Sequence, residues 1–121
     1  MNWNYSPNRP QPVGITRHLG MKVYTTNYSI TRMEEADAEG NEYRYKSVTL
    51  PLGVWSYDDI VSALINNEYP HDKMDAVVNN YLKDPDNEEF IAEMKQMQDW
   101  RDHAKAIALQ ALAYAENSQS V

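Results

Sequence analysis

Residues 85–115 read PDNEEFIAEMKQMQDWRDHAKAIALQALAYA, and no proline or glycine follows Pro85. An Asp-Pro pair at 84–85 supplies an Asx-type cap and a proline at the first helical position. We therefore predict one helix of about 31 residues, roughly 46 Å long at 1.5 Å per residue. A compact domain of this chain length is roughly 35 Å across, so the helix must protrude, break or pack on another chain.

Small and apolar residues recur along one face of this helix at alternating spacings of four and three, the spacing of a two-stranded seam. They are Phe90, Met94, Met97, Ala104, Ala108, Ala111 and Ala115, and Arg101 occupies one position of the same repeat. Ile91, Ile107 and Leu112 broaden the stripe, as they would in a helix that lies on its own core. Packing within the chain and packing between chains both stay open. In the second case the contact face would consist of Trp100, Arg101, Ala104 and Ala108.

Two strands precede the helical part of the chain. Residues 22–33 and 42–50 are rich in β-branched and aromatic residues, which alternate between two faces. A Gly-Asn pair between them predicts the turn of an antiparallel β-hairpin. Tyr43 and Tyr45 share one face of the second strand and are candidates for contact with a partner. A lone hairpin is marginal in water, so this one must pack on helices or pair with another strand.

The segment between the hairpin and the long helix predicts two short helices. Ser56 followed by Asp59 is a helix-start signal, because the serine hydroxyl can accept a backbone N–H of the first turn. Apolar residues then recur at helical spacing on either side of Pro70, which separates the two helices. The expected fold is α+β, with one domain over residues 21–115.

The two ends of the chain differ from this domain. Residues 1–20 hold three of the six prolines and predict an extended N-terminal arm with polyproline character. Trp3 and Tyr5 lie in this arm, where large aromatic side chains need a cover. They either pack on the core of their own chain or anchor a second chain. The polar residues 116–121 predict a disordered tail.

Charge is divided unevenly along the 121 residues. Residues 1–33 carry four bases and no acid, whereas residues 34–121 carry seven bases and eighteen acids, within a net charge of −7. An acidic body argues against nucleic-acid binding, which needs a clustered basic surface. No apolar run approaches the roughly 18 residues of a membrane span. We therefore expect a soluble intracellular protein with no nucleic-acid or membrane partner.

No residue pattern indicates catalysis or a cofactor. The chain has no cysteine, which excludes thiol nucleophiles and cysteine-ligated metals, and its three histidines lack metal-ligand spacing. The acidic run from Asp84 fails as a calcium loop because Glu89 and Lys95 stand where glycine and a bidentate acid are needed. We expect no enzyme, no cofactor and no metal. Nine tyrosines and three tryptophans against one phenylalanine instead favour surfaces that become buried on association.

Several short sequences within residues 28–110 are distinctive. They are the Tyr-Arg-Tyr strand at 43–45, the helix start at 57–61, the Asn-Asn-Tyr-Leu helix end at 79–82 and the Trp-Arg pair at 100–101. In this order, after a strand pair, they resemble a loosely defined group of small proteins encoded in phages and prophages of Bacteroides-type bacteria. The resemblance implies a place in the virion structural or tail-assembly module, and it brings no catalytic residues. The N-terminal arm lies outside it.

We therefore expect a non-enzymatic protein–protein interaction module, encoded by a phage and acting in the structure or assembly of a tail or fibre. The candidate contact residues are Trp3, Tyr5, Tyr43, Tyr45, Trp100, Arg101, Ala104 and Ala108. Its partners would be other virion or assembly proteins or a second copy of the chain, first in the host cytoplasm and then in the virion. The alternative is an acidic phage-encoded inhibitor of a host nucleic-acid-binding protein.

Overall fold

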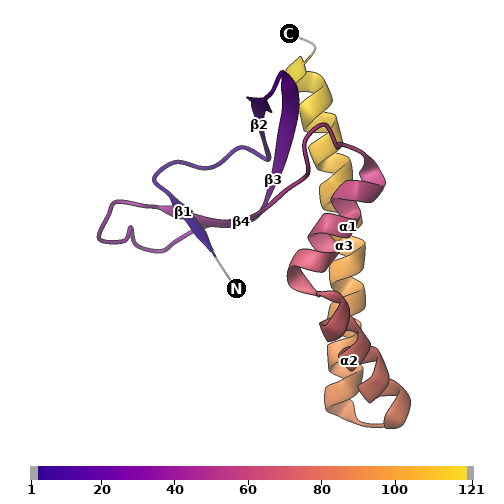
Figure 1. Cartoon of the computed structure of the whole chain (residues 1–121). Helices are drawn as coiled ribbons and strands as arrows, with labels where there is room; N and C mark the ends of the chain where they lie inside the picture. Colours follow the sequence, from indigo (N-terminus) through magenta and orange to yellow (C-terminus); the bar gives the residue numbers. More distant parts are fainter. Residues whose placement is uncertain (1–2, 120–121) are drawn as a thin grey trace.

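Four antiparallel strands and three helices follow one another in a computed structural model that describes residues 3–119 (Figure 1). The elements are β1 (Asn4–Ser6), β2 (Val13–His18), β3 (Met21–Arg32), β4 (Tyr43–Thr49), α1 (Tyr57–Glu68), α2 (His71–Lys83) and α3 (Glu88–Gln119). The predicted α+β class is confirmed, as are the two short helices and the long one after them.

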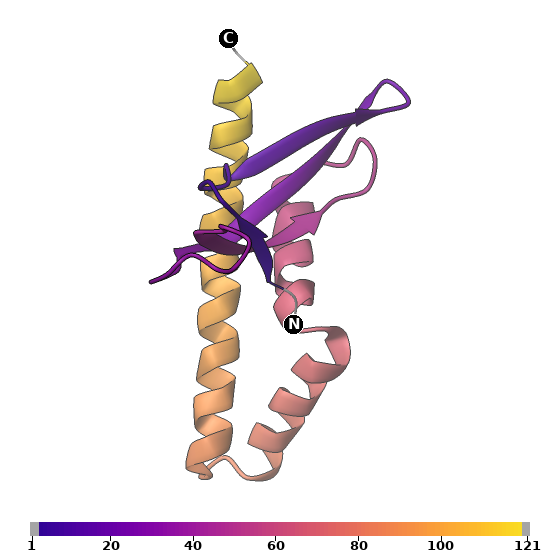
Figure 2. The same ribbon diagram turned by 90° about the vertical axis from the view of Figure 1, so that its left-hand side faces the viewer.

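The long helix α3 has 32 residues and is covered by its own chain. Helices α1 and α2 have 12 and 13 residues, and they lie one after the other along α3 (Figures 1 and 2). Ala104 and Ala108 are fully buried on the covered face of α3, and Met97 is 2% exposed. The four-and-three spacing thus fits packing within the chain. Because α1 and α2 lie along α3, this apolar stripe is covered without a second chain.

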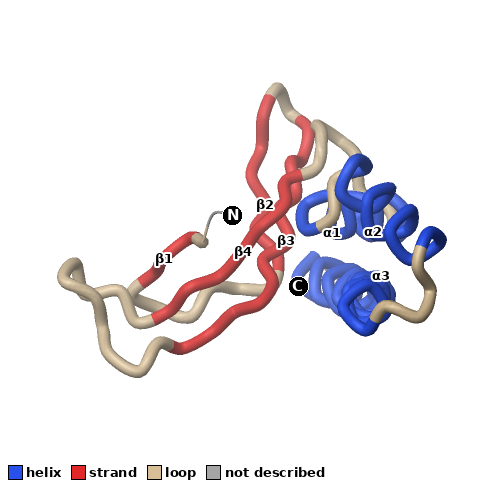
Figure 3. The backbone as a smooth tube through the Cα atoms, turned by 90° about the horizontal axis from the view of Figure 1, so that it is seen from below, coloured by secondary structure: helices blue, strands red, loops and turns tan. Residues whose placement is uncertain are grey.

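The sheet has the strand order β1-β4-β3-β2, and the predicted hairpin is its central pair, β3 and β4. Thr26 faces Val48 across this pair, and the register shifts at a bulge between Tyr28 and Thr31, where Ser29 has a φ of 52°. The helices lie on one side of the sheet (Figure 3). Tyr24 and Tyr28 of β3 are buried on the helix side, because alternate residues of a strand share a face.

The structure differs from the predicted N-terminal arm. Residues 4–18 contribute β1, which pairs with β4, and β2, which pairs with β3. The three prolines of this segment lie between β1 and β2, so they do not interrupt the pairing of either strand. Residues 21–26 of β3 pair with β2, and Val13 is buried opposite Thr26. β1 and β4 lie far apart in the sequence, so composition alone does not reveal their pairing, whereas β2 and β3 are joined by the turn at Leu19 and Gly20.

Helix boundaries follow local capping. Ser56 caps α1 as predicted, since its Oγ accepts the Asp59 backbone N–H at 3.2 Å and donates to the Asp59 carboxylate at 2.6 Å. Helix α3 begins at Glu88, later than the predicted Asp-Pro start, because Asn87 Oδ1 accepts the backbone N–H groups of Glu89 and Phe90. It also continues to Gln119 through most of the predicted disordered tail, whose last two residues lie outside the described range.

The core forms where α1 and α3 meet the sheet. Ile60 and Leu64 of α1 are fully buried, and they pack with the two buried alanines of α3 and with Tyr28. A second cluster joins β2, β3 and the C-terminal part of α3, and here the rings of Tyr24 and Trp55 stack at 4.4 Å. The small side chains of α3 let the helix approach the sheet closely. Both clusters hold the sheet against the C-terminal half of α3.

Candidate protein-interaction surface

The contact face predicted on the long helix is part of the core. Trp100 Nε1 donates to the Leu64 carbonyl at 3.1 Å, so the indole joins α3 to α1. Arg101 is half-buried, and its guanidinium lies 3.6 Å from the sulfur of Met74 in α2. Ala104 and Ala108 are fully buried within the one chain. The two alanines therefore cannot form a contact face for a second chain in this fold, and that interpretation is corrected.

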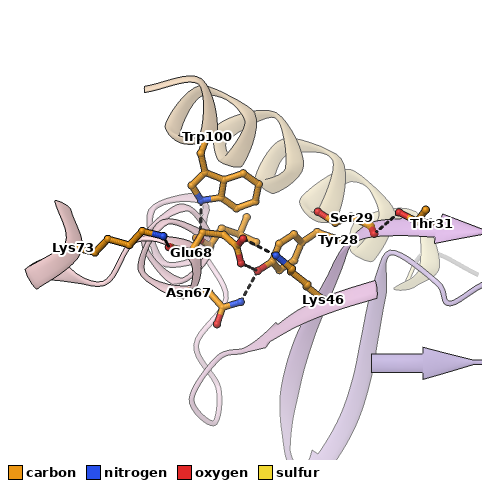
Figure 4. Close-up of polar contacts among 9 residues, drawn as sticks. Tyr28, Ser29, Thr31, Lys46, Asn67, Glu68, Lys73 and Trp100 are labelled. Carbon is orange, nitrogen blue, oxygen red and sulfur yellow. Dashed lines mark hydrogen bonds and ion pairs between the residues drawn. The ribbon is translucent and has the colours of Figure 1, made fainter. Parts of the chain in front are cut away.

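A polar cluster that the sequence does not predict lies beside Trp100 (Figure 4). The Tyr28 hydroxyl of β3 donates to Glu68 Oε2 at 2.9 Å and accepts a hydrogen bond from Asn67 Nδ2. Lys46 of β4 places Nζ 2.7 Å from Glu68 Oε1, and both side chains are mostly shielded from water. Burial raises the pKa of Tyr28 above its ordinary value, and the Glu68 carboxylate raises it further.

The arrangement of this cluster is structural. Both carboxylate oxygens of Glu68 have partners, one in the cation of Lys46 and one in the hydroxyl of Tyr28. A carboxylate held in this way is a poor general base, since its lone pairs already accept hydrogen bonds. The cluster instead fastens the last turn of α1 to two neighbouring strands. No local signal could reveal it, because its members come from three separate elements.

Part of the sheet extends away from the helices, and we call it the sheet wing. It comprises β1, the first half of β4, the last residues of β3 and the loop over residues 33–42 (Figure 3). On one face of the wing, the Trp3 ring lies 4.4 Å from the Arg44 guanidinium carbon and 4.8 Å from Lys46 Nζ. Tyr5 faces Arg44 in the register and is 52% exposed.

Tyr43 and Tyr45 occupy the other face of the sheet wing. Their register partners on β1 are Ser6 and Asn4, and both tyrosines are half-buried. The structure thus brings the aromatic pair predicted in the N-terminal arm next to the pair predicted on the second hairpin strand, although the two pairs are far apart in the sequence. Trp3 and Tyr5 share one face and the two β4 tyrosines share the opposite one, because successive strand residues alternate.

The loop of the sheet wing is ordered by its own hydrogen bonds. The Asp37 carboxylate accepts the Asn41 backbone N–H at 2.9 Å, the Asn41 side-chain amide at 3.0 Å and the Glu39 backbone N–H at 3.0 Å. These hydrogen bonds hold the pKa of Asp37 below its ordinary range, and the two from Asn41 have the largest effect. The wing therefore combines a closed loop with strand pairing along its length.

The tip of the β2–β3 hairpin is a second exposed surface, which the sequence does not predict because residues 1–20 are assigned to the arm and the domain is expected to begin at Met21. Leu19 at the turn is 82% exposed, Met21 is 49% exposed and Ile15 is 36% exposed. The glycine that follows Leu19 was the only local signal of a turn at this point.

Within residues 3–119, no three His, Cys, Asp or Glu side chains gather closely enough to hold a metal ion. No helix in that range has the length and apolar character to cross a bilayer.

Comparisons of the chain with protein-family models, with curated proteins and with solved structures found no match. The relationship to phage proteins therefore stays a prediction, and the surfaces described above carry the functional inference.

Proposed function

We propose that the protein is a non-enzymatic interaction module that docks through the sheet wing onto a protein of a phage tail or fibre, as a component of the particle or as an assembly factor. The observation that carries this proposal is the grouping of Trp3, Tyr5, Tyr43 and Tyr45 on a part of the sheet that no described helix covers. They lie on the two faces of one projecting element, so a partner that binds around the sheet wing would contact all four.

The chemistry of the sheet wing suits protein contact. Tyrosine and tryptophan combine a large apolar area with a polar group, and they dominate the residues that carry binding energy in interfaces. Arg44 beside Trp3 adds a cation that can pair with an acidic group on the partner. The partner would be a protein surface with apolar pockets and scattered carboxylates.

The attachment of the sheet wing supports the same proposal. Lys46 contacts Trp3 on the wing and forms an ion pair with Glu68 of α1, so one side chain links the wing to the helices. A surface that is already ordered loses less conformational entropy when it binds. The resemblance to phage proteins provides the context of virion assembly, in the host cytoplasm and then in the particle.

The distribution of charge favours a second candidate function. Residues 57–119 contain thirteen acids and five bases, a net charge of −8, whereas residues 1–56 have five acids and six bases. A rod-like acidic surface can imitate nucleic acid and occupy the binding site of a basic host protein. Such a complex would weaken steeply as salt is added, because screening shortens the reach of surface charges.

An affinity experiment separates these functions. The full chain is immobilised and exposed to disrupted particles and infected-cell lysate of the phage or prophage strain that encodes it, and bound proteins are identified by mass spectrometry. We expect a tail or fibre protein that resists added salt and is lost with the Tyr5→Ser/Tyr45→Ser double variant. The matched control is Leu109→Ser, which removes a 60% exposed apolar side chain from α3 and should retain the partner.

Two results would overturn the proposal. A tail protein captured equally by the native chain and the double variant would mean that the sheet wing is not the docking site. A basic nucleic-acid-binding host protein, released by moderate salt, would favour the acidic inhibitor instead.

A further inference from the structure

Leu19 occupies a turn position that ordinary packing does not explain. Its φ is +54° and that of Gly20 is +79°, the two positive angles of a mirror-image hairpin turn. Asparagine, aspartate and glycine suit such turns, whereas other L-residues are strained in this region of backbone angles. The Leu19 side chain is also 82% exposed, so contacts within the chain do not offset that strain. An apolar residue kept in a strained and exposed position points to a contact outside the chain.

The surroundings of Leu19 define the chemistry of that contact. Ile15 and Met21 add apolar surface, while Arg17 and Lys22 face each other across the strand pair. We call these five residues the hairpin knob. No acid occurs within residues 1–33, so the charge of this part of the chain is positive. The knob therefore fits a partner that offers a small apolar cavity within acidic surroundings.

The other end of the same molecule has a cavity whose lining includes the apolar residues Ala76 and Val77 among polar side chains. It lies between α2 and α3, has a volume of about 380 Å³, and is lined by Tyr69, Lys73, Ala76, Val77, Asn80, Glu93 and Gln96. Residues 69–96, which contain it, carry seven acids and three bases. In Figures 1 and 2 helix α2 and the N-terminal part of α3, which form this α2–α3 cavity, lie at the end of the molecule opposite the β2–β3 hairpin. The knob cannot reach the cavity of its own chain in this arrangement.

We propose that the chain self-associates head to tail, with the hairpin knob of one copy seated in the α2–α3 cavity of the next. Burying the leucine side chain favours the contact, and the opposite charges of the two surfaces fix their orientation. The hairpin knob and the α2–α3 cavity are different surfaces, so after one contact forms each of the two copies still has one surface free. The contact can therefore repeat and build a ring or a filament. The sheet wing has no part in this contact, so the inference does not rest on the proposed function.

The test begins with the mass in solution, measured by light scattering after size exclusion, over a range of concentrations. We expect the full chain to exceed its 14.0 kDa monomer mass increasingly with concentration. Leu19→Asn removes the apolar tip yet suits the turn, so it should be monomeric and melt at a higher temperature than the native chain. Ala76→Arg places a long cation in the cavity from an exposed helix position and should also be monomeric. Leu109→Asn, which changes an exposed leucine elsewhere, should associate as the native chain does.

Mixing the two monomeric variants decides the geometry. Leu19→Asn keeps an intact cavity and Ala76→Arg keeps an intact knob, so one contact forms and the mixture stops at a dimer. A native chain that is monomeric at every concentration would overturn the proposal. So would assembly unaffected by Leu19→Asn, or a mixture that stays monomeric although each variant is folded. None of these results bears on the affinity experiment with the sheet wing.

Discussion

Lys46 and Glu68 form an ion pair across the junction of the sheet and the helices, with Nζ 2.7 Å from Oε1 and side-chain exposures of 12% and 14%. The pair joins β4 to the last residue of α1, 22 positions later in the chain. An ion pair this shielded is costly to break from one side, because the remaining charge keeps its desolvation penalty and loses its partner. It is therefore a suitable place to test what holds the sheet wing against the helices.

Replacing Lys46 by methionine should destabilise the fold strongly. The Glu68 carboxylate would remain buried without a cation, and the free energy of unfolding should fall by about 3 kcal/mol in urea denaturation. Lys95→Met is the matched control, since its pair with Asp99 has the same 2.7 Å distance but is 75% and 63% exposed. The control should leave stability nearly unchanged. Similar losses from both variants would contradict a special role for the shielded pair.

Tyr28 should make stability depend on alkaline pH. Its pKa in the folded chain is raised above the ordinary 10.0, so this contribution to stability is fully present below pH 10 and is lost as pH rises through the folded pKa. The free energy of unfolding should therefore fall more steeply above about pH 10 in the native chain than in Tyr28→Phe. Parallel urea titrations of the two proteins measure the difference. Identical slopes would show that Tyr28 titrates as it does in the unfolded chain.

Ala108 should not tolerate a larger side chain. It is fully buried where α3 meets α1 and the sheet, so Ala108→Leu should lower the free energy of unfolding by about 1–3 kcal/mol through overpacking. Ala106→Leu, on an exposed position of the same helix, serves as the control and should have little effect. If α3 instead packed against a second chain through this face, Ala108→Leu would alter the mass in solution and leave monomer stability intact.

Gly53 should resist substitution for reasons of backbone geometry. Its φ is +75°, and an added Cβ would come within 2.5 Å of the terminal methyl of Met21. The methyl group can move, but the backbone angle cannot, so Gly53→Ala should cost about 1–2 kcal/mol by thermal denaturation. In Gly14→Ala the added Cβ would lie 4.0 Å from Thr25, at a glycine without a positive φ, and the change should be tolerated. Equal costs at both positions would point to strand packing as the cause.

The candidate surfaces could be predicted only in part. Tyr43 and Tyr45 were placed correctly on a common strand face, because alternation is a local property of an extended chain. The sequence indicates that Trp3 and Tyr5 need a cover, yet the contacts of Trp3 with Arg44 and Lys46 depend on the pairing of β1 with β4, and Tyr5 stays 52% exposed. The hairpin knob is not predicted because the β-branched residues of Val13–His18 follow a proline-rich stretch that favours an extended arm, and their strand pairing with β3 is visible only in the structure.

The sequence by itself determined the elements whose signals are local. Unbroken helical spacing after Pro85, the Ser56 cap and the alternation along residues 22–33 specify α3, α1 and β3, because capping and periodicity act over only a few residues. Only the tertiary structure decided which surfaces meet. The four-and-three spacing of the alanines on α3 suits a partner helix from either chain, and the internal choice follows from α1 and α2 lying along its length. Such contacts join residues far apart in the sequence, so their free energy depends on the whole fold.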